Sequence, residues 1–166
     1  MDVPAIIDLE ASGFGRGSYP IEVGVALSDG QVHSVLIKPP EHWVHWSDDA
    51  QSIHGISREQ LQTEGQSPRE VAMFLNNLLQ GETLYSDAWS FDSSWLGRLF
   101  DEAEIVQRFK LDTITRLLKE DELSQWSEVK DDLAQQLGIV KHRAANDVHL
   151  LRETFLKIKQ QTAQHS

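Results

Sequence analysis

The sequence predicts a mixed α/β fold in which a β-sheet packs against several helices. Residues 3–10 contain a continuous apolar run, and residues 19–39 form two β-rich runs around Asp29–Gly30. The rest of the chain alternates helical and extended patterns. A strand hairpin followed by such alternation is typical of one layered α/β unit. A chain of 166 residues is long enough to bury a core, so we expect residues 1–166 to form a single domain.

The N-terminal third is expected to build most of the sheet. The segment VPAIIDLE (3–10) has the short apolar run of a central strand that is covered on both faces. Asp29–Gly30 between two β-rich runs is a strong hairpin signal. Residues 39–57 lack a regular period, and we expect loops with short helical turns there.

The clearest predicted helix covers residues 67–81. Ser67 and Glu70 form a capping box, Pro68 stands at the first helical position, and Gly81 suits the C-terminal stop. A short strand is expected at 82–87, and further helices at 91–103, 112–119, about 123–137 and 144–161.

Composition excludes several classes of protein. The chain has no cysteine, which rules out disulfides, zinc–thiolate sites and thiol catalysis. Its N-terminus resembles neither a signal peptide nor a membrane span, so a cytoplasmic location without membrane contact is expected. The net charge of −11 is unfavourable for gripping long nucleic acid, and the basic residues concentrate in 141–159.

Two carboxylates close the first predicted strand. Asp8 and Glu10 are two residues apart, so their side chains point to the same face of a strand. Near a buried strand end they would repel each other unless a cation lay between them. All-oxygen ligation favours magnesium or manganese. Taken alone, the pattern also fits two side chains that bend into solvent.

Three further residues are candidates for the same site. Asp92 begins a predicted helix, where an Asp also serves as a cap worth about 1 kcal/mol. Asp147 lies near the core boundary of the last helix, where an unpaired carboxylate is costly. His142 stands just before that helix and can accept a proton, although a lone His is also a common structural or surface residue.

The order of these residues resembles the DEDD family of 3′–5′ exonucleases, His subclass, which includes proofreading subunits, ribonuclease T and oligoribonuclease. The resemblance covers nearly the whole chain, and HRAANDV (142–148) is its most specific stretch. The other matching segments are IIDLEASGFG (6–15), YPIEVGVAL (19–27), IHGIS (53–57) and FD (91–92). The chain departs from the family at Ala11–Ser12, often Thr-Thr or Thr-Ser, and at Asp87–Ala88, often His-Asn.

The resemblance implies a ribonuclease H-like α/β fold with a five-stranded mixed sheet flanked by helices. It also implies that His142 is the general base and that two divalent cations, Mg²⁺ or Mn²⁺, are bound by four acids. These ligands would be Asp8, Glu10, Asp92 and Asp147. Asp92 is preferred to Asp87 as the second-motif ligand because Phe91 precedes it, as in the family.

The resemblance further implies how substrate is bound. Phe14 matches an apolar wedge beside the terminal base, and Ile53 and His54 match positions near that nucleotide. Phe14 fits equally well as a loop residue packed on the core. The expected partners are single-stranded DNA or RNA and short oligonucleotides, and a homodimer is left open. Two alternatives remain: a non-catalytic nucleic-acid or nucleotide-binding module on the same fold, and an unrelated α/β protein with acids as caps and surface residues.

Overall fold

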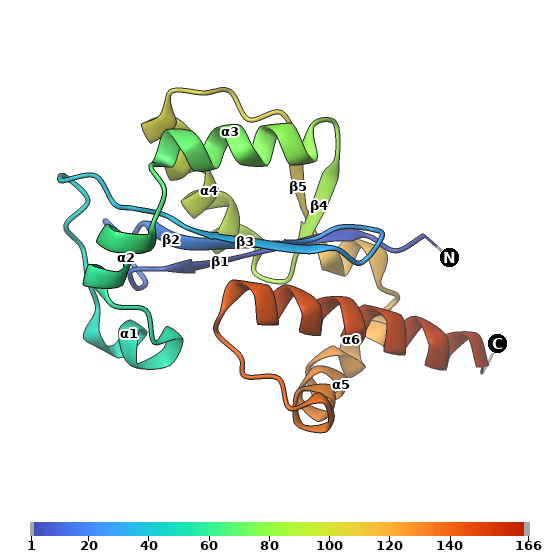
Figure 1. Cartoon of the computed structure of the whole chain (residues 1–166). Helices are drawn as coiled ribbons and strands as arrows, with labels where there is room; N and C mark the ends of the chain where they lie inside the picture. The colour runs from blue at the N-terminus through green and yellow to red at the C-terminus, as the bar shows by residue number, and fades with distance from the viewer. Residues whose placement is uncertain (1, 165–166) are drawn as a thin grey trace.

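A five-stranded sheet divides the molecule into two helical layers (Figure 1). The computed structural model describes residues 2–164. The strands, in the sheet order β3-β2-β1-β4-β5, are β1 (Ala5–Ala11), β2 (Pro20–Ala26), β3 (Val32–Leu36), β4 (Thr83–Ser86) and β5 (Lys110–Thr113). The helices are α1 (Asp48–His54), α2 (Arg58–Glu64), α3 (Pro68–Leu79), α4 (Trp89–Ala103), the 3₁₀ turn η1 (Ile114–Leu117), α5 (Glu120–Leu137) and α6 (Ala144–Gln164).

The sheet is mixed, as predicted. Strands β1, β2 and β3 pair antiparallel, whereas β1 with β4 and β4 with β5 pair parallel. Because β1 and β4 run in the same direction, their carboxyl ends lie at one edge of the sheet. The acids that end β1 and the start of α4, which follows β4, therefore meet at that edge.

Strand β1 sends alternate side chains into two separate cores. Ile7 and Leu9 belong to the core under α3 and α4, whereas Ile6 belongs to the core under α5 and α6. Side chains alternate along a strand, so Asp8 and Glu10 lie on the same face as Ile6, toward α6. The apolar face thus becomes acidic toward the end of the strand.

Helix α6 begins unusually close to the sheet. Gly24 on β2 pairs with Asp8, and a Cβ atom at Gly24 would lie 2.6 Å from the carbonyl of Ala144. Glycine at this position therefore permits the first residue of α6 to rest on the strand. This contact fixes where Asp147, in the first turn of α6, can point.

Most predicted elements are confirmed, and one is wrong in part. The capping box of α3, the hairpin at Asp29–Gly30 and the final helix are present. Residues 112–119 do not form the predicted helix, because 112–113 complete β5 and 114–117 form η1. Pairing with β4 decides the conformation of this short segment, which its local pattern does not reveal. None of the described helices is long and apolar enough to cross a membrane.

Candidate active site

A pocket of about 400 Å³ lies where β1 ends and α4 and α6 begin. Its lining includes the five predicted catalytic residues, which are Asp8, Glu10, Asp92, His142 and Asp147. They come from β1, the first turn of α4, the segment before α6 and the first turn of α6. The tertiary fold therefore brings together residues that are up to 139 positions apart in the sequence.

Asp8 and Asp92 form the buried part of the pocket. Asp8 is 9% exposed, and its Oδ2 atom has no hydrogen-bond partner among the described residues. Burial, followed by the charges of Asp92 and Asp147, raises the pKa of Asp8 well above its usual value. Asp92 is 1% exposed and accepts a 2.6 Å hydrogen bond from the Ser86 hydroxyl. Burial is the main cause that raises the pKa of Asp92 to about 7.

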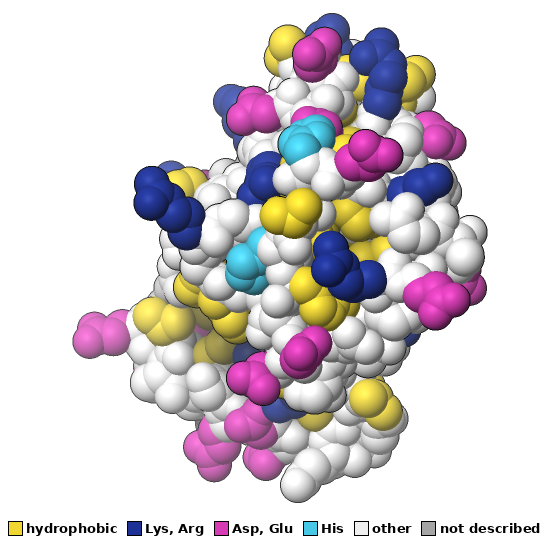
Figure 2. All heavy atoms as spheres, turned by 90° about the vertical axis from the view of Figure 1, so that its left-hand side faces the viewer, with side chains coloured by type: hydrophobic (Ala, Val, Ile, Leu, Met, Phe, Trp, Pro, Cys, Tyr) yellow, Lys and Arg dark blue, Asp and Glu magenta, His cyan; other side chains and the backbone are white. Residues whose placement is uncertain are grey.

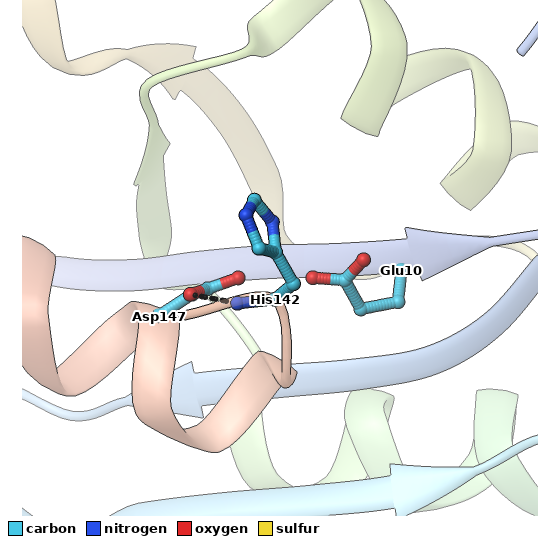
Figure 3. A group of neighbouring side chains, drawn as sticks. All are labelled: Glu10, His142 and Asp147. Atoms are coloured by element: carbon cyan, nitrogen blue, oxygen red, sulfur yellow. Dashed lines mark hydrogen bonds between the residues drawn. The ribbon is translucent and has the colours of Figure 1, made fainter. Parts of the chain in front are cut away.

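Glu10, His142 and Asp147 form the more open part (Figure 3). One oxygen of each carboxylate and one ring nitrogen lie within 4.8 Å of one another. The two carboxylates point toward each other, with the imidazole ring beside the space between them. Burial, then a hydrogen bond with Asp147 and its charge, raises the pKa of Glu10 to about 9.

The backbone at His142 has an uncommon conformation. Its φ angle is 74°, in the left-handed region that few residues other than glycine adopt. The His142 amide donates a 2.9 Å hydrogen bond to Oδ1 of Asp147, and the Asn146 side chain donates one to the carbonyl of Val140. These contacts hold the segment before α6 so that the exposed ring of His142 stands over the carboxylates.

The donor set of the pocket fits divalent cations. Four carboxylates converge, one of their buried oxygens lacks a partner, and three of the four have raised pKa values. Such a cluster is unfavourable without positive charge, and carboxylate oxygens are the ligands that Mg²⁺ and Mn²⁺ prefer. The closest donor triplet also includes a nitrogen of His142, so the ring lies within reach of a bound cation.

Asp87 has surroundings different from those of Asp92. It lies at the edge of the pocket, and its Oδ2 atom is 3.3 Å from the ammonium of Lys130 on α5. Asp92 has no cation of this kind among its described contacts and is far more deeply buried. Helix α4 starts at Trp89, so Asp92 lies inside the first turn and no side-chain cap begins the helix. The alternative role of Asp92 as a cap is therefore wrong.

An aromatic cluster borders the pocket. Phe14 is 67% exposed. Its ring centroid lies 5.3 Å from that of Phe91, in an edge-to-face arrangement, and 6.0 Å from that of Trp95. Phe91 is itself half exposed and stacks on Trp95. In the sequence, Phe91 served only to match Asp92 to the family motif. Its spacing of four from Trp95 on a helix was the signal that both rings share one face.

Ile53 and His54 contribute to the wall beside α1. Ile53 is exposed at the pocket, whereas His54 is only 5% exposed. Nδ1 of His54 accepts a 3.0 Å hydrogen bond from the Ile56 amide, and burial lowers the pKa of the ring. The structure therefore leaves Ile53 accessible to a ligand and places His54 behind it in the wall.

Glu22 is a buried acid that the sequence reasoning did not single out. It pairs with Glu10 across β1 and β2 and is 3% exposed. Its carboxylate accepts hydrogen bonds from Arg143 Nε at 3.1 Å, Arg143 Nη2 at 2.9 Å and the Ala144 amide at 2.8 Å. A carboxylate within an apolar strand needs such partners, and this was the available signal. Glu22 thus ties the start of α6 to the sheet.

The comparisons with known proteins define a class of fold. No protein-family model and no curated protein matches the sequence. Among solved structures the chain is similar to exonuclease I of E. coli. The complex with a dA16 oligonucleotide gives a TM-score of 0.72 at 13% identity over 97% of this chain. A zinc-bound complex with single-stranded DNA gives 0.73 at 13% identity over 95%, and a complex with dT13 gives 0.72 at 13% identity over 99%.

This similarity concerns the fold. The chain has the α/β fold with a five-stranded mixed sheet of the ribonuclease H-like nuclease domain in exonuclease I, as the sequence predicted. It spans 41% of the exonuclease I chain in the dA16 complex and 40% in the zinc-bound complex.

Proposed function

We propose that the chain is a metal-dependent 3′–5′ exonuclease that hydrolyses phosphodiester bonds at the 3′ end of single-stranded or short nucleic acid. The convergence of Asp8, Glu10, Asp92 and Asp147 with His142 in one pocket carries this proposal. A binding module needs no cluster of unneutralised acids beside a proton acceptor. The fold shared with a protein crystallised with single-stranded DNA supports the same substrate class.

The four acids would hold two divalent cations, Mg²⁺ or Mn²⁺. Bound cations of this kind activate water and stabilise negative charge on the phosphodiester oxygens. Asp8 and Asp92 hold the buried side of the site, and Glu10 and Asp147 hold the open side. The Ser86 hydroxyl donates a hydrogen bond to Oδ2 of Asp92 and so helps to fix this carboxylate at the pocket.

His142 would accept the proton of the attacking water. Imidazole changes its protonation state near neutral pH, which suits a general base there. The ring stands beside the space between Glu10 and Asp147, where a water molecule can be held between them and the ring. The hydrogen bond from the His142 amide to Asp147 keeps the proposed base and the proposed ligand close together.

The terminal nucleotide would stack on the aromatic cluster. Phe14 and Phe91 present exposed rings, and Ile53 adds an apolar contact, with His54 behind it. Every base has a flat π-face, so stacking of this type tolerates different bases.

A degradation assay tests the proposal. Single-stranded DNA and RNA oligonucleotides labelled at the 5′ end are incubated with Mg²⁺ or Mn²⁺ and, separately, with excess chelator. We expect ladders that shorten from the 3′ end, release of mononucleotides, and no reaction with chelator. Circular single strands should remain intact, and blunt long duplexes should react more slowly than single strands. Binding without release of mononucleotides would instead support a non-catalytic module.

A further inference from the structure

The pocket is strongly acidic, yet two basic residues border it. Its lining includes five aspartate and glutamate residues, and Lys130 and Lys141 are the only lysine or arginine residues in that lining among the described part of the chain. A nucleic acid substrate is a polyanion, and it gains affinity by contacts between its phosphates and Lys or Arg. These two lysines are therefore the residues available to offset repulsion at the site itself.

Lys130 is held at the edge of the pocket by Asp87. Its ammonium lies 3.3 Å from Oδ2 of Asp87, at a position where the chain departs from the exonuclease pattern. The lysine side chain remains about a quarter exposed. An ammonium carries three N–H donors, and the described contacts of Lys130 use one of them. The remaining donors can bind phosphate oxygens without loss of the ion pair.

Lys141 stands next to His142 in the segment between α5 and α6. Its ammonium donates a 2.6 Å hydrogen bond to Asp131, whose side chain is mostly exposed. Exposed ion pairs of this kind are weak. A phosphate can therefore share or replace this partner at little cost, and Lys141 already lines the pocket together with His142.

The two lysines and the aromatic cluster come from opposite layers of the molecule. Lys130 belongs to α5, below the sheet in Figure 1, whereas Phe91 belongs to α4, above it. Figure 2 shows the end of the molecule where α1 and α2 lie, with basic, acidic and hydrophobic side chains all exposed on it. A single strand that stacks its bases on the aromatic side can thus present its phosphates to the α5 side.

We propose that Lys130 and Lys141 form a phosphate-binding edge of the site, which grips the backbone of a single-stranded oligonucleotide. This inference rests on the proposed function and adds to it the means by which an acidic chain binds its polyanionic substrate. Lys130 and Lys141 contribute to substrate affinity and its dependence on salt. They take no part in proton transfer.

Fluorescence anisotropy of a labelled single-stranded oligonucleotide tests this edge. Affinity is measured over a range of KCl concentrations with Mg²⁺ present, in an Asp92→Asn background that prevents cleavage. The variants are Lys130→Gln, Lys141→Gln and both together. Lys157→Gln is the matched control, because it removes the same charge from an exposed position far along α6. Lys→Arg variants at both sites test whether charge alone suffices, and thermal unfolding verifies that each variant is folded.

Each lost contact should reduce the slope of log K against log [salt] by about 0.7, the value for single strands. The slope should therefore fall by about 1.4 in the double variant, which should also bind more weakly at low salt. Lys157→Gln and the Arg variants should keep the slope of the parent. An oligonucleotide with uncharged methylphosphonate linkages should bind the parent and the double variant equally.

Two results would overturn the phosphate-binding edge: a double variant with the slope of the control, or a parent that binds no oligonucleotide. These outcomes are independent of catalysis. If the wild-type chain cleaves normally while the lysine variants in the Asp92→Asn background keep the slope of that background, the edge alone is refuted. If the wild-type chain cleaves nothing while the slopes fall as expected, the exonuclease proposal is refuted and the edge stands.

Discussion

The left-handed backbone of His142 shows how closely this single residue is held. Few non-glycine residues adopt such a φ angle, and the amide hydrogen bond to Asp147 helps to keep it there. The same contact brings the imidazole ring beside Glu10. A general base needs this kind of fixed position relative to the groups that hold its water.

Replacement of His142 should separate proton transfer from metal binding. His142→Ala is expected to lower kcat by roughly 10²–10⁴-fold, the usual contribution of a positioned base. Asn tolerates left-handed backbone better than Ala, so His142→Asn is the matched variant that removes the ring with less change in the loop. Rate–pH profiles and Mn²⁺ titrations of the parent and both variants measure the two effects.

We expect both variants to turn over more slowly at every pH tested, while Mn²⁺ affinity changes little. The ring nitrogen also belongs to the donor triplet that could hold a cation. Much weaker Mn²⁺ binding, with turnover restored at saturating Mn²⁺, would make His142 a ligand or structural residue.

Asp87 and Asp92 provide a second matched pair. Asp92→Asn should abolish cleavage and weaken metal binding, because its carboxylate is buried in the acidic cluster. Asp87→Asn should retain most activity, since that carboxylate already has Lys130 as its counter-ion. Cleavage rates and Mn²⁺ affinities of the two variants, measured side by side, check this. Loss of activity only in Asp87→Asn would reverse the assignment.

At the scale of elements, the start of α6 is the part most tightly coupled to the site. Glu22 on β2 binds both Arg143 and the Ala144 amide, and Gly24 allows the helix to rest on the strand. His142 and Asp147 flank these contacts. Any shift of this helix end therefore displaces a predicted base and a predicted ligand together.

Glu22→Gln should loosen this attachment. The amide keeps the shape of the side chain but weakens the charge-assisted contacts with Arg143 and the Ala144 amide, which we expect to cost about 1–3 kcal/mol of unfolding free energy. Cleavage should fall mainly through kcat, because the site is displaced while the aromatic and basic contacts to substrate remain. Glu128→Gln, an exposed change on α5, serves as control. Denaturant unfolding and steady-state kinetics measure both effects, and normal kcat in a destabilised protein would limit Glu22 to a structural role.

At the scale of the whole molecule, the acidic cluster should make stability depend on pH and on cations. The folded, metal-free chain raises the pKa of Asp8, of Glu10 to about 9 and of Asp92 to about 7, chiefly by burial. A carboxyl group whose pKa is higher in the folded state than in the unfolded state stabilises the folded protein fully when the pH is below its unfolded-state pKa. This stabilisation is lost as the pH rises through its folded-state pKa.

With chelator present, the thermal midpoint should therefore fall as pH rises from about 6 to about 9. Mg²⁺ or Mn²⁺ should raise the thermal midpoint again at the higher pH, because ions that bind only the folded state stabilise that state. Asp8→Asn should flatten the fall, whereas Asp87→Asn should leave it nearly unchanged. Differential scanning fluorimetry measures these midpoints. A chelated protein that is equally stable across this range and indifferent to Mn²⁺ would argue against a cation site.

Local chemistry in the sequence determined much of the fold and the candidates for the site. The capping box at Ser67, the turn at Asp29–Gly30 and the periodic apolar residues of α6 specify their elements with neighbours only a few positions away. The order of four acids and one His indicated the site only through its resemblance to the exonuclease family. The helices, strands and turns are readable because they depend on short-range backbone and side-chain preferences.

Tertiary structure decided what depends on distant partners. Residues 112–113 became part of β5 because β4 lies beside them, and Asp92 proved to be a buried member of the acidic cluster rather than a cap. The pairing of Asp87 with Lys130 and the attachment of α6 through Glu22 join segments 43 and 121 residues apart. Such contacts depend on how the layers pack. Burial and electrostatic interactions act between residues that are close in space, so they produce no regular pattern of residue types in the sequence.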